Sequence, residues 1–219
     1  MRKVLICFAF ILGNSAQAQE VVIAALGDSL TQGYGLPVEE GFVPQLQAWL
    51  DGQGIEARIV NAGVSGDTTA GGLARVDWTL TPEVDAMIVT LGGNDMLRGL
   101  DPAQARGNID GILAAAEQAK VDVLLVGMSA PGNYGASYKA DFEGLYPALA
   151  EQYETLFYPD FFTGLLAEEK GAATARSETI QLYFQGDSIH PNAEGVSLIV
   201  GDIGPSVAAL TAQVKDQDR

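Results

Sequence analysis

Two residues that lie far apart in the chain, Ser29 and His190, could together carry out nucleophilic catalysis. Ser29 lies in a Gly-Asp-Ser-Leu sequence at 27–30, directly after an apolar run, and His190 is the single histidine of the 219 residues. A serine hydroxyl is a weak nucleophile until a neighbouring base removes its proton, and imidazole suits that task near neutral pH. Because the chain has one imidazole, the pair indicates a serine hydrolase in which the base has no competitor.

A carboxylate that could support this base lies three positions before it. Asp187 and His190 belong to Asp-Ser-Ile-His-Pro at 187–191. At this spacing the carboxylate can reach one imidazole nitrogen while the other nitrogen faces Ser29. Alone, such a pair would more often be a structural contact at the start of a helix. We expect Asp187 to fix the imidazole tautomer and to stabilise the imidazolium ion.

Hydrogen-bond donors for a developing oxyanion occur in two further loops. Gly66 lies in a glycine-rich loop at 61–68, where the backbone can approach a ligand closely, and Asn94 lies in Gly-Gly-Asn-Asp at 92–95. We expect an oxyanion hole formed by the backbone N–H groups of Ser29 and Gly66 and by the Asn94 amide. Each motif alone would more often be a helix cap or a turn. Their occurrence at successive strand ends favours the catalytic interpretation.

Apolar residues beside Asn94 are candidates for substrate contact. Met96, Leu97 and Leu100, together with the Gly-Asn-Tyr-Gly loop at 132–135, could line an acyl groove. Arg98 could meet a phosphate or a carboxylate, but we expect it to form a surface ion pair.

Short apolar runs alternate along the chain with longer segments whose apolar residues recur at helical spacing. The predicted strands are 21–26, 57–60, 86–91, 121–127 and 156–158, and the predicted helices are 42–50, 68–80, 102–120, 137–152 and 191–210. We place Pro191 in the first turn of the last helix and expect the polar tail after Thr211 to fray. The alternation implies an α/β fold of three layers, α/β/α, with a parallel sheet. Ligands of such sheets bind beyond the carboxyl ends of the strands, where all the loops described above fall.

Residues 1–18 are typical of a secretory signal peptide. Arg2 and Lys3 precede an apolar run at 4–12, and Ala-Gln-Ala at 16–18 predicts cleavage after Ala18. The alternative, an uncleaved membrane anchor, is disfavoured because the run is shorter than the roughly 20 residues of a membrane span. The sequence therefore predicts a periplasmic or secreted protein with a single domain at 19–219, without a stable membrane anchor.

Composition excludes several classes of protein and of site. The one cysteine, Cys7, lies in the predicted signal peptide, so the mature chain has no disulfide and no thiolate ligand. The chain has 12 basic and 28 acidic residues, a net charge of −16. This charge disfavours nucleic acid and anionic membranes as partners. Whether it reflects adaptation to salt stays open.

The sequence disfavours both a metal site and a second nucleophile. A metal held by His190 with Asp28, Asp95 or Asp187 would have one imidazole and no thiolate, so we expect no metal. Gly-Met-Ser-Ala-Pro at 127–131 departs from the nucleophile elbow Gly-x-Ser-x-Gly because proline replaces the second glycine.

The four loops, in this order, resemble the sequence blocks of the SGNH or GDSL hydrolases. Position by position, the family nucleophile falls on Ser29, its oxyanion-hole residues on Gly66 and Asn94, and its acid and base on Asp187 and His190. The stretches 61–75 and 91–100 look like the branch of bacterial periplasmic thioesterases, lysophospholipases and arylesterases. The resemblance implies a flavodoxin-like sheet of five strands in the order 2-1-3-4-5.

The resemblance also implies the activity. We expect hydrolysis of acyl esters, including aryl esters, lysophospholipids and acyl-CoA thioesters, through an acyl-serine, with no cofactor and in a monomer. A carbohydrate acetylesterase with the same catalytic blocks is the alternative enzyme. A non-catalytic scaffold with the same fold is disfavoured by the intact nucleophile, base and donors.

Overall fold

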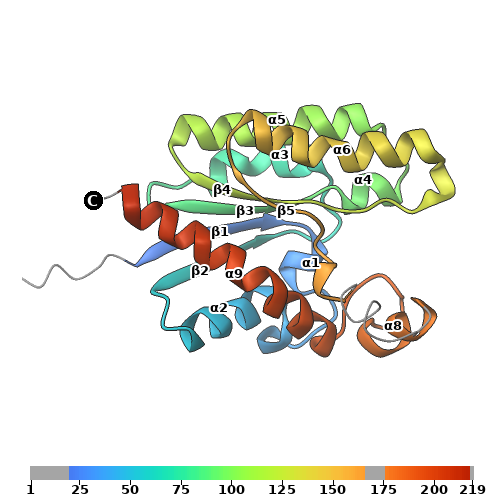
Figure 1. Cartoon of the computed structure of the whole chain (residues 1–219), viewed down its shortest axis with the longest axis horizontal. Helices are drawn as coiled ribbons and strands as arrows, with labels where there is room; N and C mark the ends of the chain where they lie inside the picture. Colours follow the sequence, from blue (N-terminus) through green and yellow to red (C-terminus); the bar gives the residue numbers. More distant parts are fainter. Residues whose placement is uncertain (1–19, 166–175, 218–219) are drawn as a thin grey trace, which may run out of the picture.

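The computed structural model describes residues 20–165 and 176–217, in which a five-stranded parallel sheet forms the centre of the molecule (Figure 1). The strands are β1 (Val21–Gly27), β2 (Ala57–Gly63), β3 (Ala86–Thr90), β4 (Asp122–Val126) and β5 (Leu156–Tyr158). Their order is β2-β1-β3-β4-β5, and each neighbouring pair is parallel. The predicted order and the three-layer α/β class are thus confirmed. The predicted signal peptide lies outside the described residues.

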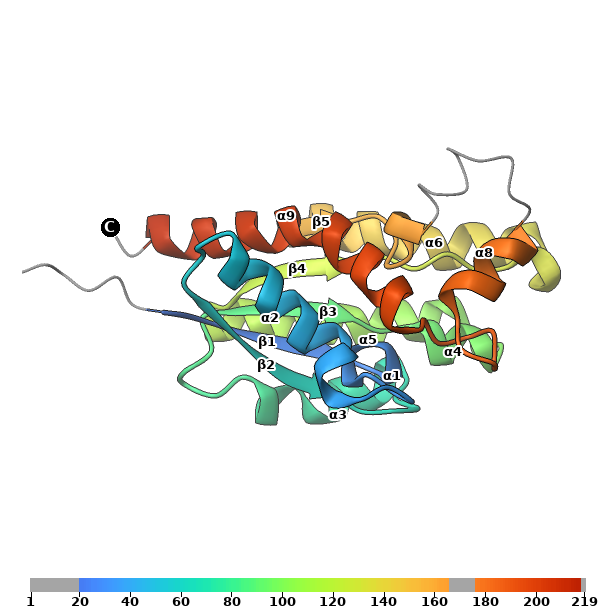
Figure 2. The same ribbon diagram turned by 90° about the horizontal axis from the view of Figure 1, so that it is seen from below.

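Helices cover both faces of the sheet. The α-helices are α1 (Ser29–Gln32), α2 (Phe42–Gly52), α3 (Thr69–Thr79), α4 (Gly93–Leu97), α5 (Pro102–Ala119), α6 (Ala136–Gln152), α8 (Arg176–Tyr183) and α9 (Ala193–Gln217), and the 3₁₀ helices are η1 (Val38–Glu40) and η2 (Gly132–Tyr134). Helices α3, α5 and α6 pack side by side on one face, and α2 packs with α9 on the other (Figures 1 and 2). The two layers leave the carboxyl ends of the strands open to the connecting loops.

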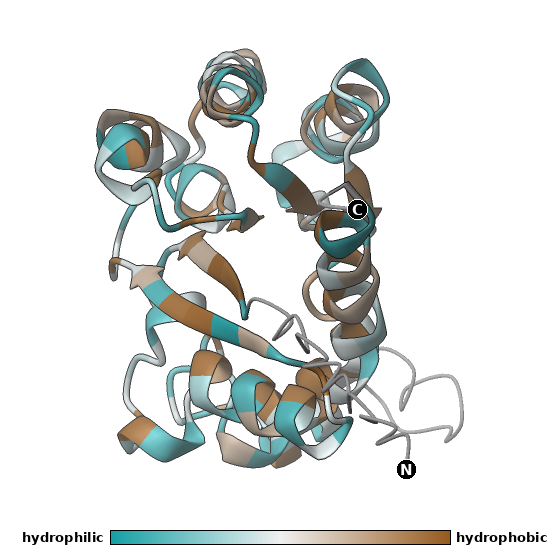
Figure 3. Cartoon of the chain, turned by 90° about the vertical axis from the view of Figure 1, so that its left-hand side faces the viewer, coloured by the Kyte–Doolittle hydropathy of each residue, from teal (hydrophilic) through white to brown (hydrophobic). Residues whose placement is uncertain are grey.

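Burial explains why the central strands are continuous apolar runs. Every residue of β1 and β3 is buried, as expected for parallel strands covered on both faces. Figure 3 shows the hydrophobic strand segments enclosed between the two helical layers. The edge strand β2 is partly exposed, and the Gln47 side chain of α2 bonds to its backbone, donating to the Ala57 oxygen at 2.8 Å and accepting from the Ile59 N–H at 2.8 Å. Fewer groups of this edge remain for pairing with another strand.

The last helix differs from its prediction at both ends. It begins at Ala193, because Pro191 forms an antiparallel bridge with Phe184 and the Asn192 side chain accepts the N–H of Gly195 at 2.9 Å, an N-cap contact. The prediction of a frayed tail after Thr211 was wrong. The helix continues to Gln217, since Val214 is buried and Lys215 lies 3.8 Å from Glu56.

Helix α9 is the one described helix long and apolar enough to cross a membrane by length and composition. Half of that stretch is buried inside the protein. Its apolar side, including Ile199, Ile203, Val207 and Leu210, belongs to the core. Its hydrophobicity is therefore accounted for by packing on α2 and the sheet.

Candidate active site

Ser29, His190 and Asp187 form a continuous chain of hydrogen bonds. His190 Nε2 lies 2.8 Å from Ser29 Oγ, and His190 Nδ1 lies 2.6 Å from Asp187 Oδ2. The second carboxylate oxygen, Asp187 Oδ1, accepts the backbone N–H groups of Ile189 and His190 at 2.9 and 3.0 Å. With its Nδ1–H donated to Asp187, the neutral imidazole presents an acceptor to the serine hydroxyl. This is the geometry of a base poised to take the hydroxyl proton.

The position of Ser29 follows from a short helix that begins where β1 ends. Asp28 caps α1, Ser29 is its first residue, and Gly33 ends it in the left-handed conformation with φ 88°. The helix packs so closely against β2 that a Cβ atom at Gly63 would lie 2.4 Å from the backbone nitrogen of Gln32. The four-residue helix was not predicted, because it is too short to show helical periodicity.

The carboxylate of Asp28, next to Ser29 in the chain, is buried and only 2% exposed. Its Oδ1 accepts the N–H of Leu30 at 3.0 Å, and its Oδ2 accepts the side-chain amide of Asn94 at 3.1 Å. Desolvation by burial raises the pKa of Asp28 from its ordinary 3.8 to about 6, although these hydrogen bonds and His190 act to lower it. Asp28 therefore fixes which way the Asn94 amide points, a contact that the sequence did not reveal.

The predicted oxyanion donors share one cavity. Ser29, Gly66 and Asn94 all line it, together with His190. Gly66 has φ +84°, a left-handed conformation that glycine adopts without strain. Arg98, expected in a surface ion pair, instead donates from Nη2 to the Gly66 carbonyl at 2.8 Å. The guanidinium thus fixes the peptide unit that follows Gly66.

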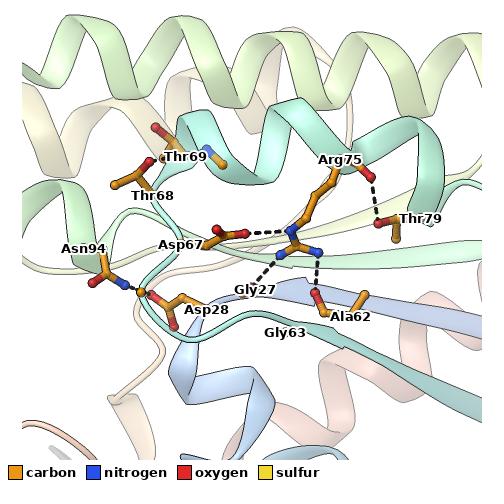
Figure 4. A network of polar contacts seen from close by, with 12 residues as sticks. Gly27, Asp28, Ala62, Gly63, Asp67, Thr68, Thr69, Arg75, Thr79 and Asn94 are labelled. Atoms are coloured by element: carbon orange, nitrogen blue, oxygen red, sulfur yellow. Dashed lines mark hydrogen bonds and ion pairs between the residues drawn. The ribbon is translucent and has the colours of Figure 1, made fainter.

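A partly buried arginine holds the loop after β2 against the end of β1 (Figure 4). Arg75 of α3 donates from Nε to Asp67 at 2.6 Å, from Nη1 to the Ala62 carbonyl at 2.6 Å and from Nη2 to the Gly27 carbonyl at 2.8 Å. One side chain therefore joins the loop that carries Gly66 to both neighbouring strands. Arg75 was not predicted as a site residue, because two of its three partners are backbone carbonyls, those of Ala62 and Gly27, which local sequence does not point to.

The asparagine loop is tied to the same helix by a second buried carboxylate. Asp95 accepts the Thr69 N–H at 2.8 Å and the Thr69 hydroxyl at 2.6 Å. Asn108 of α5 donates to that hydroxyl at 2.9 Å. These contacts fix α4, which carries Asn94, against the start of α3.

The cavity at the serine has a volume of about 750 Å³, within the range of small-molecule sites. Met96 and Leu97 line it, as the sequence predicted. Leu100 does not line the cavity, so the prediction that it contacts substrate was wrong. Gly99 turns the chain with φ 62°, and the Leu100 N–H bonds back to the Asp95 carbonyl at 2.9 Å. The carboxyl-terminal part of the chain supplies apolar walls that the sequence analysis missed, including Phe162, Leu165 and Phe184.

The 127–131 segment, which departs from the nucleophile elbow, also contributes to this cavity. Met128 and Pro131 line it beyond the end of β4. In the 132–135 loop, Gly132 lines the cavity. Tyr134 does not, and its half-exposed side chain donates a hydrogen bond to the Leu97 carbonyl at 3.4 Å. Because ligands of parallel sheets bind at the carboxyl ends of the strands, the position of 127–131 directly after β4 could have indicated its place in the cavity. Within residues 20–165 and 176–217 there is no group of three or more His, Cys, Asp or Glu side chains placed to hold a metal ion.

Proteins similar to this chain include esterases and lipases. The family profile described as "GDSL-like Lipase/Acylhydrolase family" matches residues 25–198. "Esterase TesA" of Pseudomonas aeruginosa is 36% identical over 213 residues, which cover 96% of this chain and 100% of that protein. "Thioesterase 1/protease 1/lysophospholipase L1" of Escherichia coli K12 is 31% identical over 193 residues, 88% of this chain and 85% of that protein. The crystal structure of "AlinE4, a SGNH-hydrolase family esterase" superimposes with a TM-score of 0.67 and 44% identity, covering 87% of this chain and 96% of that one.

Proposed function

The chain belongs to the GDSL-like lipase/acylhydrolase family, and from that premise we propose that it hydrolyses acyl esters through an acyl-serine intermediate. One observation carries the proposal: the 2.8 and 2.6 Å contacts that join Ser29, His190 and Asp187 at a cavity with apolar walls. A nucleophile, a base and an acid that orients the base form the catalytic triad of many serine hydrolases.

His190 acts first as a base and then as an acid. It removes the proton from Ser29 Oγ as this oxygen attacks the acyl carbonyl, and it then gives that proton to the departing oxygen or sulfur of the substrate. Water, activated by the same imidazole, attacks the acyl-serine and releases the carboxylic acid. The N–H groups of Ser29 and Gly66 and the Asn94 amide hold the oxyanion in both steps.

Asp187 remains a carboxylate throughout this cycle. Burial acts to raise its pKa, but the hydrogen bonds from the His190 side chain, from the His190 backbone and from the Ile189 backbone outweigh it and lower the pKa from 3.8 to about 2. The carboxylate can therefore stabilise imidazolium at any pH at which the imidazole itself is a useful base.

The apolar lining supports acyl chains of several lengths as substrates. Met96, Leu97, Met128 and Phe162 offer few polar groups to reject one chain in favour of another, and a methylene in such a pocket discriminates by only about 1–3 kcal/mol. We propose aryl esters, lysophospholipids and acyl-CoA thioesters as substrates. The same lining favours these over the acetylated sugars of the alternative carbohydrate esterase.

We further propose that residues 1–18 direct export to the periplasm or the cell exterior and that 19–219 act as a single domain. The basic start, short apolar run and Ala-Gln-Ala ending support the export signal. We propose that the protein has no nucleic-acid partner, because its net charge is −16. We propose that it is a monomer, because the Gln47 contacts occupy part of the edge strand.

An ester-length scan tests the proposed activity. Purified mature protein and its Ser29→Ala variant are compared on p-nitrophenyl esters from acetate to palmitate, on palmitoyl-CoA and on a lysophospholipid. Serine-dependent turnover of medium or long chains supports the proposal. Turnover confined to acetate would favour the carbohydrate acetylesterase, and turnover that survives Ser29→Ala would refute the assignment of the nucleophile.

A further inference from the structure

The ring of Tyr34 lies against the imidazole of His190. The two ring centroids are 4.6 Å apart and the planes are inclined by 39°. Tyr34 is 51% exposed, and both side chains line the cavity at Ser29. Half-exposed tyrosines on loops need no partner, so its placement against the base calls for a structural explanation.

The backbone of Tyr34 is bonded to both halves of the site. Its N–H donates to the Ser29 carbonyl at 3.1 Å. Its own carbonyl accepts the Gln185 side-chain amide at 2.8 Å, and that amide also donates to the Pro191 carbonyl at 2.9 Å. The Gln185 N–H donates to the His190 carbonyl at 2.8 Å. Tyr34 therefore connects the turn that carries the nucleophile to the loop that carries the base.

Hydrogen bonds fix the edge of the imidazole but not its faces. Nδ1 is held by Asp187 and Nε2 by Ser29, and the buried carboxylate of Asp28 interacts electrostatically with His190. A ring held at two edge atoms can still tilt about the line that joins them. An aromatic side chain against one face limits that tilt, and the electron-rich face of a tyrosine attracts a cation.

We propose that Tyr34 is a positioning residue for His190, holding the imidazole in line between Ser29 and Asp187 and stabilising the imidazolium that forms as Ser29 is acylated. The inference rests on the proposed function of the Ser29 site. It predicts that the aromatic ring of Tyr34, rather than its hydroxyl, is what the reaction requires.

Kinetics of two variants at this position test the proposal. Tyr34→Leu removes the aromatic face but keeps an apolar side chain, and we expect kcat and kcat/KM on p-nitrophenyl butyrate to fall together by about three- to tenfold, because the lost interaction strengthens only in the transition state. Tyr34→Phe keeps the ring and should restore most of that loss. Trp78→Leu, which removes an 85% exposed aromatic ring outside the cavity, is the control and should leave both parameters unchanged.

The single histidine provides a second readout that does not require turnover. The ring-proton resonances of His190 are the only ones of their kind in the chain, and the nearby aromatic ring must shift them. We expect Tyr34→Leu to move these resonances and Tyr34→Phe to leave them close to those of the unmodified protein. Thermal unfolding and fluorophosphonate labelling of Ser29 report folding and the concentration of active sites, so that kcat is expressed per reactive serine.

Three outcomes would overturn the proposal. His190 resonances that Tyr34→Leu leaves in place would mean that the ring contact is absent in solution. A raised KM with unchanged kcat would make Tyr34 a wall of the substrate cavity instead. Equal losses in Tyr34→Phe and Tyr34→Leu would assign the effect to the hydroxyl. Failure of the proposed function is distinguishable from all three, because it shows as equal turnover by the unmodified protein and by Ser29→Ala.

Discussion

Replacing Asp28 by asparagine should make the protein more stable and less active. The substitution keeps the size of the side chain and removes a charge that is only 2% exposed. An asparagine can still accept the Leu30 N–H and cap α1. Towards Asn94, however, its amide would offer a donor or a weaker acceptor in place of a carboxylate oxygen at 3.1 Å.

The pKa of Asp28 sets the size of the stability change. Raising it from 3.8 to about 6 costs the folded state about 3 kcal/mol at pH 7, where the buried group is ionised. Because the folded pKa lies above the unfolded one, this cost is absent below pH 3.8, grows as the pH rises from 3.8 to about 6, and is constant above. The Asp28→Asn variant should therefore gain up to about 3 kcal/mol at pH 7 and almost nothing at pH 3.5.

The activity of Asp28→Asn should change in the opposite direction. Losing an oxyanion donor altogether costs about 10²–10³ in kcat. A donor that is present but poorly oriented should cost less, and we expect kcat to fall by about 10- to 100-fold with little change in KM.

Urea unfolding at pH 3.5 and pH 7, followed by tryptophan fluorescence, measures the stability of Asp28→Asn. Asp77→Asn is the matched control, because it removes one negative charge from an exposed position of α3. An equal stability change at the two pH values, or in the two variants, would contradict the reasoning from burial. Full activity in Asp28→Asn would contradict the role assigned to the contact with Asn94.

Three further predictions concern the groups around Ser29. Asn94→Ala should lower kcat by about 10²–10³ on p-nitrophenyl butyrate, while its far-ultraviolet circular dichroism spectrum stays normal. A loss below tenfold would contradict the assignment of Asn94 to the oxyanion hole. Asp187→Asn should lower kcat by about 10⁴, because the wrong tautomer of His190 is favoured. Since the pKa of Asp187 is about 2, the pH–rate profile of the unmodified enzyme should show no ionisation of this carboxyl group between pH 4 and 9. Arg75→Met breaks three contacts at 2.6–2.8 Å. It should lower the free energy of unfolding by about 1–3 kcal/mol and also lower kcat. An unchanged kcat would show that these contacts do not determine the position of the loop that carries Gly66.

The boundaries of several elements show where local sequence stops being informative. The frayed tail was predicted from the polar residues after Thr211, yet Val214 is buried and the helix continues. Leu100 is apolar like Met96 and Leu97, but the turn at Gly99 places it outside the cavity lining. In each case a contact with a distant segment, or a single backbone torsion, outweighed the local pattern.

The sequence alone determined the fold class, the strand ends that carry the chemistry and the five residues proposed for catalysis. This was possible because strand and helix periodicity is local, and because the single histidine and the four loop motifs left few ways to build a base and an oxyanion hole. The tertiary structure decided how these residues are tuned. The burial that raises the pKa of Asp28, the ring of Tyr34 on His190 and the Arg75 network depend on desolvation and on contacts between segments far apart in the chain, and neither can be read from local composition.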